Sequence, residues 1–170
     1  GVSLVEKINQ EIDSILSQTK NIIDRPRIFC MDWMSPIFSA GHWIPEMVHI
    51  AGGQTIKIEK NTSTRVTFKE LLNFAPNFIF IMPCGYDIER TTREINILLE
   101  NPELNKIPAF NMGQVYIVNA NAYFSKPTYR IVEGIKIIAK TINRQNFKYD
   151  PDADAILNLQ NYIHFESFAG

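Results

Sequence analysis

The feature that most constrains the fold is a set of short, continuously apolar runs separated by segments with helical periodicity. Phe78 to Met82 is the clearest of these runs, and Ile28 to Met31 and Val115 to Val118 are two more. A strand that is apolar at every position must be covered on both faces, as parallel strands between two helical layers are. The alternation of such strands with helices predicts an α/β fold with a mostly parallel sheet sandwiched between helices.

The intervening segments carry helix start and stop signals. Thr67 and Glu70 have the spacing of a capping box, and Val66 and Leu71 that of a hydrophobic staple, so a helix is expected over 67–74. Further elements are expected as helices at 43–51, from Asp87 to Asn101, from Pro127 to Ile142 and at about 153–163, and as a weaker strand at 55–58.

The first 23 residues have one apolar stripe, which predicts a helix of about six turns. The stripe is formed by Val5, Ile8, Ile12, Ile15, Thr19 and Ile22. The pattern starts at once, with little room for a helix cap, and there is no initiator methionine. We therefore expect a fragment of a longer protein, in which 1–23 is the rear part of a helix that begins further upstream.

Composition excludes several classes of partner. The 170 residues are 45% hydrophobic, which is typical of a globular protein with a substantial core, and the net charge is −1 without a basic run. A nucleic-acid partner is therefore not expected. The two cysteines form no CxxC pair, and no apolar stretch approaches the roughly 20 residues of a membrane helix.

Three loops that directly follow strands contain aromatic residues. They are 32–36, 83–87 and 119–124, and the rings are those of Trp33, Tyr86, Tyr123 and Phe124. Because ligands of open parallel sheets bind beyond the carboxyl ends of the strands, exposed rings at this edge would suit a flat, largely apolar ligand. The alternative is that these rings only cover the edge of the sheet.

The segment around the 43–51 helix contains two histidines and a glutamate. His42 and His49 are seven residues apart, about 10 Å along a helix, so they cannot share a metal ion whose bonds are about 2 Å long. His42 and Glu46 could supply two ligands, but no third is evident. Cys84 is the one candidate nucleophile, without a locatable histidine base, and the common catalytic motifs are absent.

Three specific segments, AGHWIPEM, MPCGYDIER and NAYFSKP, resemble the cobalamin-binding branch of the metal-chelate substrate-binding proteins of ABC importers. The resemblance covers roughly residues 1 to 143. It implies that 1–23 is the rear of a helix linking two lobes, that 24–143 is the C-terminal ligand-binding lobe, and that 144–170 is an extension with a helix. No catalytic activity, cofactor or protein-bound metal is implied.

The resemblance also implies the site and the partners. The ligand would be a corrinoid or similar metal chelate, clamped against an N-terminal lobe of the same protein and delivered to a membrane permease outside the cytoplasm. The residues that would face the ligand or edge its cleft are Trp33, His42, Trp43, Cys84, Gly85, Tyr86, Asn121, Tyr123 and Phe124.

One position departs from the family pattern. Where family members place an acidic residue that pairs with permease arginines, this chain has Ser125, and Asp87 or Glu133 would have to substitute. A cytoplasmic corrinoid-handling or chelatase-like enzyme, using His42, Glu46 or Cys84, is therefore the alternative. A third interpretation is that the aromatic edge docks another protein.

Overall fold

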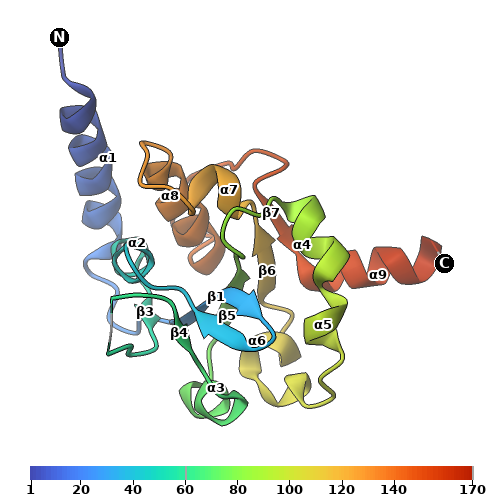
Figure 1. Cartoon of the computed structure of the whole chain (residues 1–170). Helices are drawn as coiled ribbons and strands as arrows, with labels where there is room; N and C mark the ends of the chain where they lie inside the picture. Colours follow the sequence, from blue (N-terminus) through green and yellow to red (C-terminus); the bar gives the residue numbers. More distant parts are fainter. Residues whose placement is uncertain (60, 170) are drawn as a thin grey trace.

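A single mixed sheet organises the chain in the computed structural model, which describes residues 1–59 and 61–169 (Figure 1). The strand order is β4-β2-β1-β5-β6-β7, and β3 also pairs with β1. The strands are β1 (Arg27–Met34), β2 (Ile37–Ser39), β3 (Gln54–Thr55), β4 (Thr64–Arg65), β5 (Phe78–Ile81), β6 (Val115–Val118) and β7 (Ile156–Asn158).

The central strands β1, β5 and β6 pair in parallel, with Cys30 opposite Phe80 and Phe80 opposite Tyr116. Since successive side chains point to opposite faces of a sheet, Phe80 belongs to one core cluster and its neighbours Ile79 and Ile81 to the other. Both faces are buried, which explains why Ile28 to Met31, Phe78 to Ile81 and Val115 to Val118 have no charged residue. The prediction of an α/β fold with a mostly parallel sheet between helices is confirmed.

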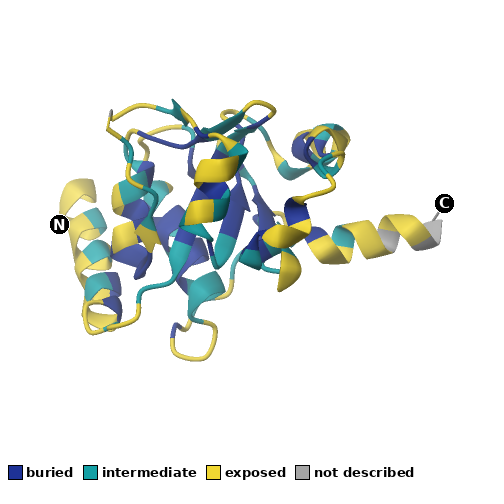
Figure 2. Cartoon of the chain, turned by 90° about the horizontal axis from the view of Figure 1, so that it is seen from below, coloured by how far each residue is buried: buried dark blue, intermediate teal, exposed yellow. Residues whose placement is uncertain are grey.

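Helices form a layer on each face. The α-helices are α1 (Leu4–Thr19), α2 (Ile44–Ala51), α3 (Phe68–Phe74), α4 (Ile88–Glu94), α5 (Asn96–Leu99), α6 (Pro108–Asn111), α7 (Ala120–Tyr123), α8 (Ile131–Ile142) and α9 (Leu159–Ala169), with a 3-10 turn at Leu104–Lys106. Helices α1, α2 and α8 cover the face that carries Phe80, and α3, α5, α6 and the start of α9 cover the other. Figure 2 shows buried strands between helices with exposed outer surfaces.

Helix α1 packs on the body mainly through its C-terminal half, and Ile8 in the other half is partly buried against the same core. Ile15 and Thr19 are buried, and the Thr19 hydroxyl donates to the carbonyl of Ile50 over 2.7 Å. The N-terminal half projects from the body (Figure 1), and Val5 is 66% exposed. The expectation of an uncapped start is wrong, because Ser3 and Glu6 form a complete capping box.

Helix α3 confirms the capping signal in the sequence. The Glu70 amide donates to the Thr67 hydroxyl, and the Thr67 amide donates to the Glu70 carboxylate. Hydrogen bonding of the Glu70 carboxylate to the Thr67 backbone amide, and then to the Thr67 side chain, lowers the pKa of Glu70.

Elements at the margins of the sheet differ from the predictions. The expected helix at 153–163 is wrong at its start, because 156–158 forms β7, antiparallel to β6, and the helix runs over Leu159–Ala169. Pairing with β7 satisfies the free edge of β6, and no local pattern signals it. Strands β2 and β4, at the other margin of the sheet, are also missed, because no local sequence pattern signals them. The predicted strand at 55–58 is reduced to Gln54–Thr55, and the helix after Asp87 is divided into α4 and α5.

Candidate functional site

The carboxyl ends of β1, β5 and β6 meet at one edge, and hydrogen bonds tie their loops together. The Gly85 amide donates to the Ser125 hydroxyl over 2.8 Å, and the Asn121 amide donates to the Tyr86 carbonyl over 3.0 Å. The loop after β5 is thereby fixed against the loop after β6. The expectation that these two loops reach the same edge of the sheet is confirmed.

Two of the four expected rings form a partly exposed pair on this edge. The rings of Trp33 and Tyr86 meet edge to face with 5.7 Å between centroids, and the Arg90 guanidinium lies 3.8 Å from the Tyr86 centroid. The Tyr86 hydroxyl donates to Glu94 over 3.2 Å, and the Trp33 indole donates to the Ser35 carbonyl over 3.1 Å. Each ring is therefore oriented at its polar end and leaves apolar surface at the rim.

The other two rings are not exposed, and here the sequence analysis is wrong. Tyr123 is 6% exposed and Phe124 is 3% exposed, because α7 turns them into the core formed by α2 and α8. The Tyr123 hydroxyl donates to Asp152 over 3.2 Å. Burial and then the carboxylate of Asp152 raise the pKa of the Tyr123 phenol. Tyr123 therefore holds the 147–155 segment on the body instead of presenting a ring at the edge.

A hollow of about 190 Å³ opens at the same edge, between the ends of the strands and the start of α2, and neither Trp33 nor Tyr86 is part of its lining. It contains four predicted site residues: the neighbours His42 and Trp43, and Cys84 and Phe124 from distant parts of the sequence. Its lining is Asp32, Ala40, Gly41, His42, Trp43, Ile44, Ser63, Met82, Cys84, Phe124 and Ser125. Of the remaining predicted residues, Gly85 and Asn121 lie in the neighbouring loops and are exposed.

Sequence analysis missed the polar groups of the hollow. Asp32 directly follows the apolar run of β1 and could have been found by its place at the end of the strand. Ser63, which donates to the Asp32 carboxylate, comes from the loop before β4, and no local pattern predicts that this loop folds back over the strand ends. Ser125 was singled out only as a docking position, whereas its hydroxyl accepts the Gly85 amide.

Trp43 fastens α2 to the last of the three loops. Its indole donates to the Phe124 carbonyl over 2.9 Å, and its ring lies against that of His42 with 5.6 Å between centroids. His42 itself has φ 52 and precedes α2, so it is not part of the helix that carries Glu46 and His49. Within residues 1–59 and 61–169, no three His, Cys, Asp or Glu side chains are grouped to hold a metal ion.

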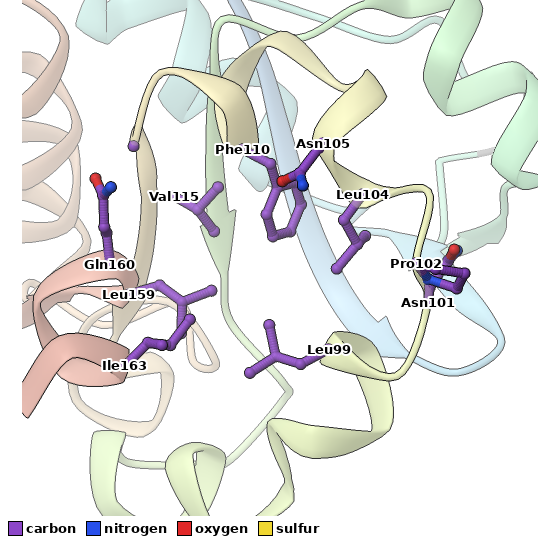
Figure 3. A pocket seen from close by; sticks show the side chains of 11 residues that line it. Leu99, Asn101, Pro102, Leu104, Asn105, Phe110, Val115, Leu159, Gln160 and Ile163 are labelled. Atoms are coloured by element: carbon purple, nitrogen blue, oxygen red, sulfur yellow. The ribbon is translucent and has the colours of Figure 1, made fainter. Parts of the chain in front are cut away.

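A larger hollow of about 380 Å³ lies at the other end of β6 and has a different character (Figure 3). Leu99, Leu104 and Phe110 approach it from one side, and Leu159 and Ile163 of α9 from the other, over Val115 at the start of β6. All its lining side chains are neutral. It is a gap between α5, α6 and α9, with amides but no reactive group.

The two cysteines differ in accessibility, which gives a direct test of this edge. Cys30 is buried in β1, where burial and then the nearby Asp32 raise the pKa of its thiol, whereas Cys84 is exposed in the hollow. We expect a disulfide reagent such as dithionitrobenzoate to modify one thiol in the native chain and the second only after denaturant is added. Cys84→Ser should abolish the native reaction. Two rapidly reacting thiols would contradict the placement of Cys30.

The geometry defines an α/β lobe with a small hollow and an aromatic pair at the carboxyl edge of its parallel strands. The chain belongs to the periplasmic binding protein family, whose model matches residues 1–122. Comparison with curated protein sequences returns no match. In the residues that the structure describes, no helix is both long and apolar enough to cross a membrane.

Solved structures share the fold at low sequence identity. An ABC transporter substrate-binding protein from Listeria monocytogenes aligns with a TM-score of 0.74 and 18% identity over 84% of this chain and 56% of that one. The periplasmic vitamin B12 binding protein BtuF of Vibrio cholerae gives 0.61 and 18% over 80% and 51%. An ABC-type Fe3+-hydroxamate transport protein from Saccharomonospora viridis gives 0.67 and 14% over 82% and 48%. The chain thus spans about half the length of these structures.

Proposed function

We propose that this chain is the ligand-binding lobe of a non-catalytic substrate-binding protein of an ABC importer, and that its ligand is a corrinoid or similar metal chelate. The observation that carries the proposal is the oriented pair of Trp33 and Tyr86 at the same strand-end edge of the sheet as the hollow. Family membership supports it, as do the relatives described as binding vitamin B12 or transporting Fe3+-hydroxamate.

The size of the hollow supports a shared cleft. About 190 Å³ is less than the roughly 300–1,000 Å³ of a pocket that encloses a small molecule on its own. A lobe that spans half the length of its solved relatives would supply one wall, and an N-terminal lobe would supply the other. The flat faces of the aromatic pair suit a planar ligand, since rings bury much area with few rotatable bonds.

The contacts of the reactive groups favour binding over catalysis. An activated cysteine needs a base within hydrogen-bond reach, and that base is usually oriented by a third group. His42 and Cys84 line the same hollow, but in the described part of the chain no residue hydrogen-bonds to the His42 imidazole. Glu46 is exposed on α2 and is not part of the lining. The enzyme alternative therefore has no observation in its favour.

A permease partner and a location outside the cytoplasm belong to the same proposal. Of the two acidic residues considered for docking, Glu133 is engaged by the Tyr149 hydroxyl and by Lys136. Asp87 is exposed at the start of α4, where it accepts the Arg90 amide over 2.8 Å. Asp87 is thus the better candidate to meet a basic permease surface.

Titration calorimetry with cobalamin, ferric haem and a ferric hydroxamate siderophore tests the binding function. We expect cobalamin to bind most tightly, and Trp33→Ala to weaken its binding by about 1–3 kcal/mol, roughly five- to 150-fold, because an oriented aromatic contact is lost. Met112→Ala is the matched control. Met112 is an exposed apolar side chain just before β6, at the end of that strand away from the hollow, and its loss should leave the affinity unchanged.

Two results of this titration would each contradict part of the proposal. If none of the three chelates binds the wild-type chain, the proposed function is wrong. If cobalamin binds equally to wild type and Trp33→Ala, the ligand does not lie on the aromatic pair.

A further inference from the structure

The imidazole of His42 has no hydrogen-bond partner in the described part of the chain. Its side chain is exposed and lines the hollow with Cys84 and Ser125. The backbone amide of His42 donates to the Asn61 carbonyl over 3.2 Å, and the His42 ring lies tilted against the ring of Trp43. Among residues 1–59 and 61–169, none donates to or accepts from either imidazole nitrogen.

The position of this imidazole is nevertheless fixed by its neighbours. With φ 52, His42 lies in the left-handed region, which histidine enters more readily than most residues. Gly41 lies so close to the loop before β4 that a Cβ there would be 2.3 Å from the Thr62 carbonyl carbon. On the other side, Trp43 is held by its bond to the Phe124 carbonyl. The backbone therefore places the ring at the mouth of the hollow without a bond to the ring itself.

A single free nitrogen donor suits a particular class of metal. A bare ion is bound by three or four protein groups, and the described residues contain no such cluster. A metal that is already held in the plane of a macrocycle needs only one donor along its axis. Neutral imidazole is among the commonest of metal ligands, and one ring nitrogen is sufficient.

We infer that His42 is an axial ligand for the metal of the bound chelate, which would therefore be a planar complex with an exchangeable axial position. This inference rests on the proposed function. The step is a ligand exchange: the metal–oxygen bond to an axial water breaks, and a metal–nitrogen bond to the imidazole forms. The oxidation state of the metal does not change, and the second ring nitrogen keeps its proton.

The test compares two cobalamins on the untagged chain. In aquacobalamin the axial water exchanges, whereas in cyanocobalamin a cyanide occupies that position. We expect the visible absorption bands of aquacobalamin to shift when it binds wild-type protein. We expect no shift with His42→Asn, and an affinity at least about tenfold weaker, the usual scale for losing one good contact. Cyanocobalamin should bind both proteins equally.

The variants are chosen so that folding does not confuse the result. Asparagine also tolerates the left-handed conformation, so His42→Asn removes the imidazole with little backbone strain. His49→Ala is the matched control, because His49 is an exposed histidine at the other end of α2 and does not line the hollow. It should keep the full spectral shift.

Each outcome separates this inference from the proposed function. Binding of aquacobalamin by calorimetry without a band shift, or with the same shift in His42→Asn, overturns axial ligation and leaves the binding function in place. Absence of binding by both cobalamins and by ferric haem overturns axial ligation, and absence of binding by the ferric hydroxamate siderophore as well overturns the proposed function.

Discussion

Tyr123→Ala is expected to lower the free energy of unfolding by about 3–5 kcal/mol, the scale for removing a buried aromatic side chain. The ring is packed between α7 and α8, and the Arg130 guanidinium lies 5.3 Å from its centroid. The hydroxyl bond to Asp152 ties the loop before β7 to the body. Removal of the Tyr123 side chain therefore leaves a cavity and also releases the loop before β7. Urea denaturation followed by circular dichroism measures the loss.

Tyr123→Phe separates the two contributions. The ring remains and only the bond to Asp152 is lost, so a smaller cost of about 1 kcal/mol is expected, because Asp152 is exposed to solvent. Neither variant removes a ring from the surface of the edge, so a folded Tyr123→Phe should bind the chelate as wild type does. A Tyr123→Ala variant as stable as wild type but unable to bind would instead support the exposed ring that the sequence suggested.

The central strands were predictable because their burial is complete. Phe78 to Met82 and Val115 to Val118 are apolar at every position, and only a doubly covered parallel strand gives that pattern. The edge strands were not predictable from the sequence. β7 has a mixed, half-buried composition and exists because β6 offers a free edge about 40 residues earlier in the chain. A partner so distant leaves no trace in the local sequence.

The candidate site also has a part that the sequence predicts and a part that it does not. The rule that ligands bind beyond strand ends placed Trp33, Cys84 and Tyr86 on one edge, and the structure brings them together. The rule cannot say which way a ring turns after it leaves the strand. For Tyr123 that is decided by α8 and by the 147–155 segment, both of which lie later in the sequence. The role of each residue in ligand binding stays a prediction.

The loop that carries Asn61 and Ser63 completes the hollow only because Gly41 has no side chain. A Cβ at Gly41 would lie 2.3 Å from the Thr62 carbonyl carbon and 2.8 Å from the Ser63 amide nitrogen, and both are backbone atoms that no rotamer change can move. Gly41→Ala must therefore displace the loop. We expect a loss of about 1–3 kcal/mol in unfolding free energy, as for other overpacked sites.

Displacement of this loop should also loosen the site. The Asn61 carbonyl accepts the His42 amide, and Ser63 donates to Asp32, so both bonds are expected to break in Gly41→Ala. Hydrogen exchange reports the first directly, because the His42 amide should lose its protection while amides of the central strands keep theirs. Gly85→Ala is the control at the same rim. Its Cβ would meet no atom within 4 Å, but φ is +79, so it should cost about 1 kcal/mol of backbone strain and leave the His42 amide protected. Equal loss of protection in both variants would show that general loosening of the edge, and not the contact between Gly41 and Thr62, controls where His42 lies.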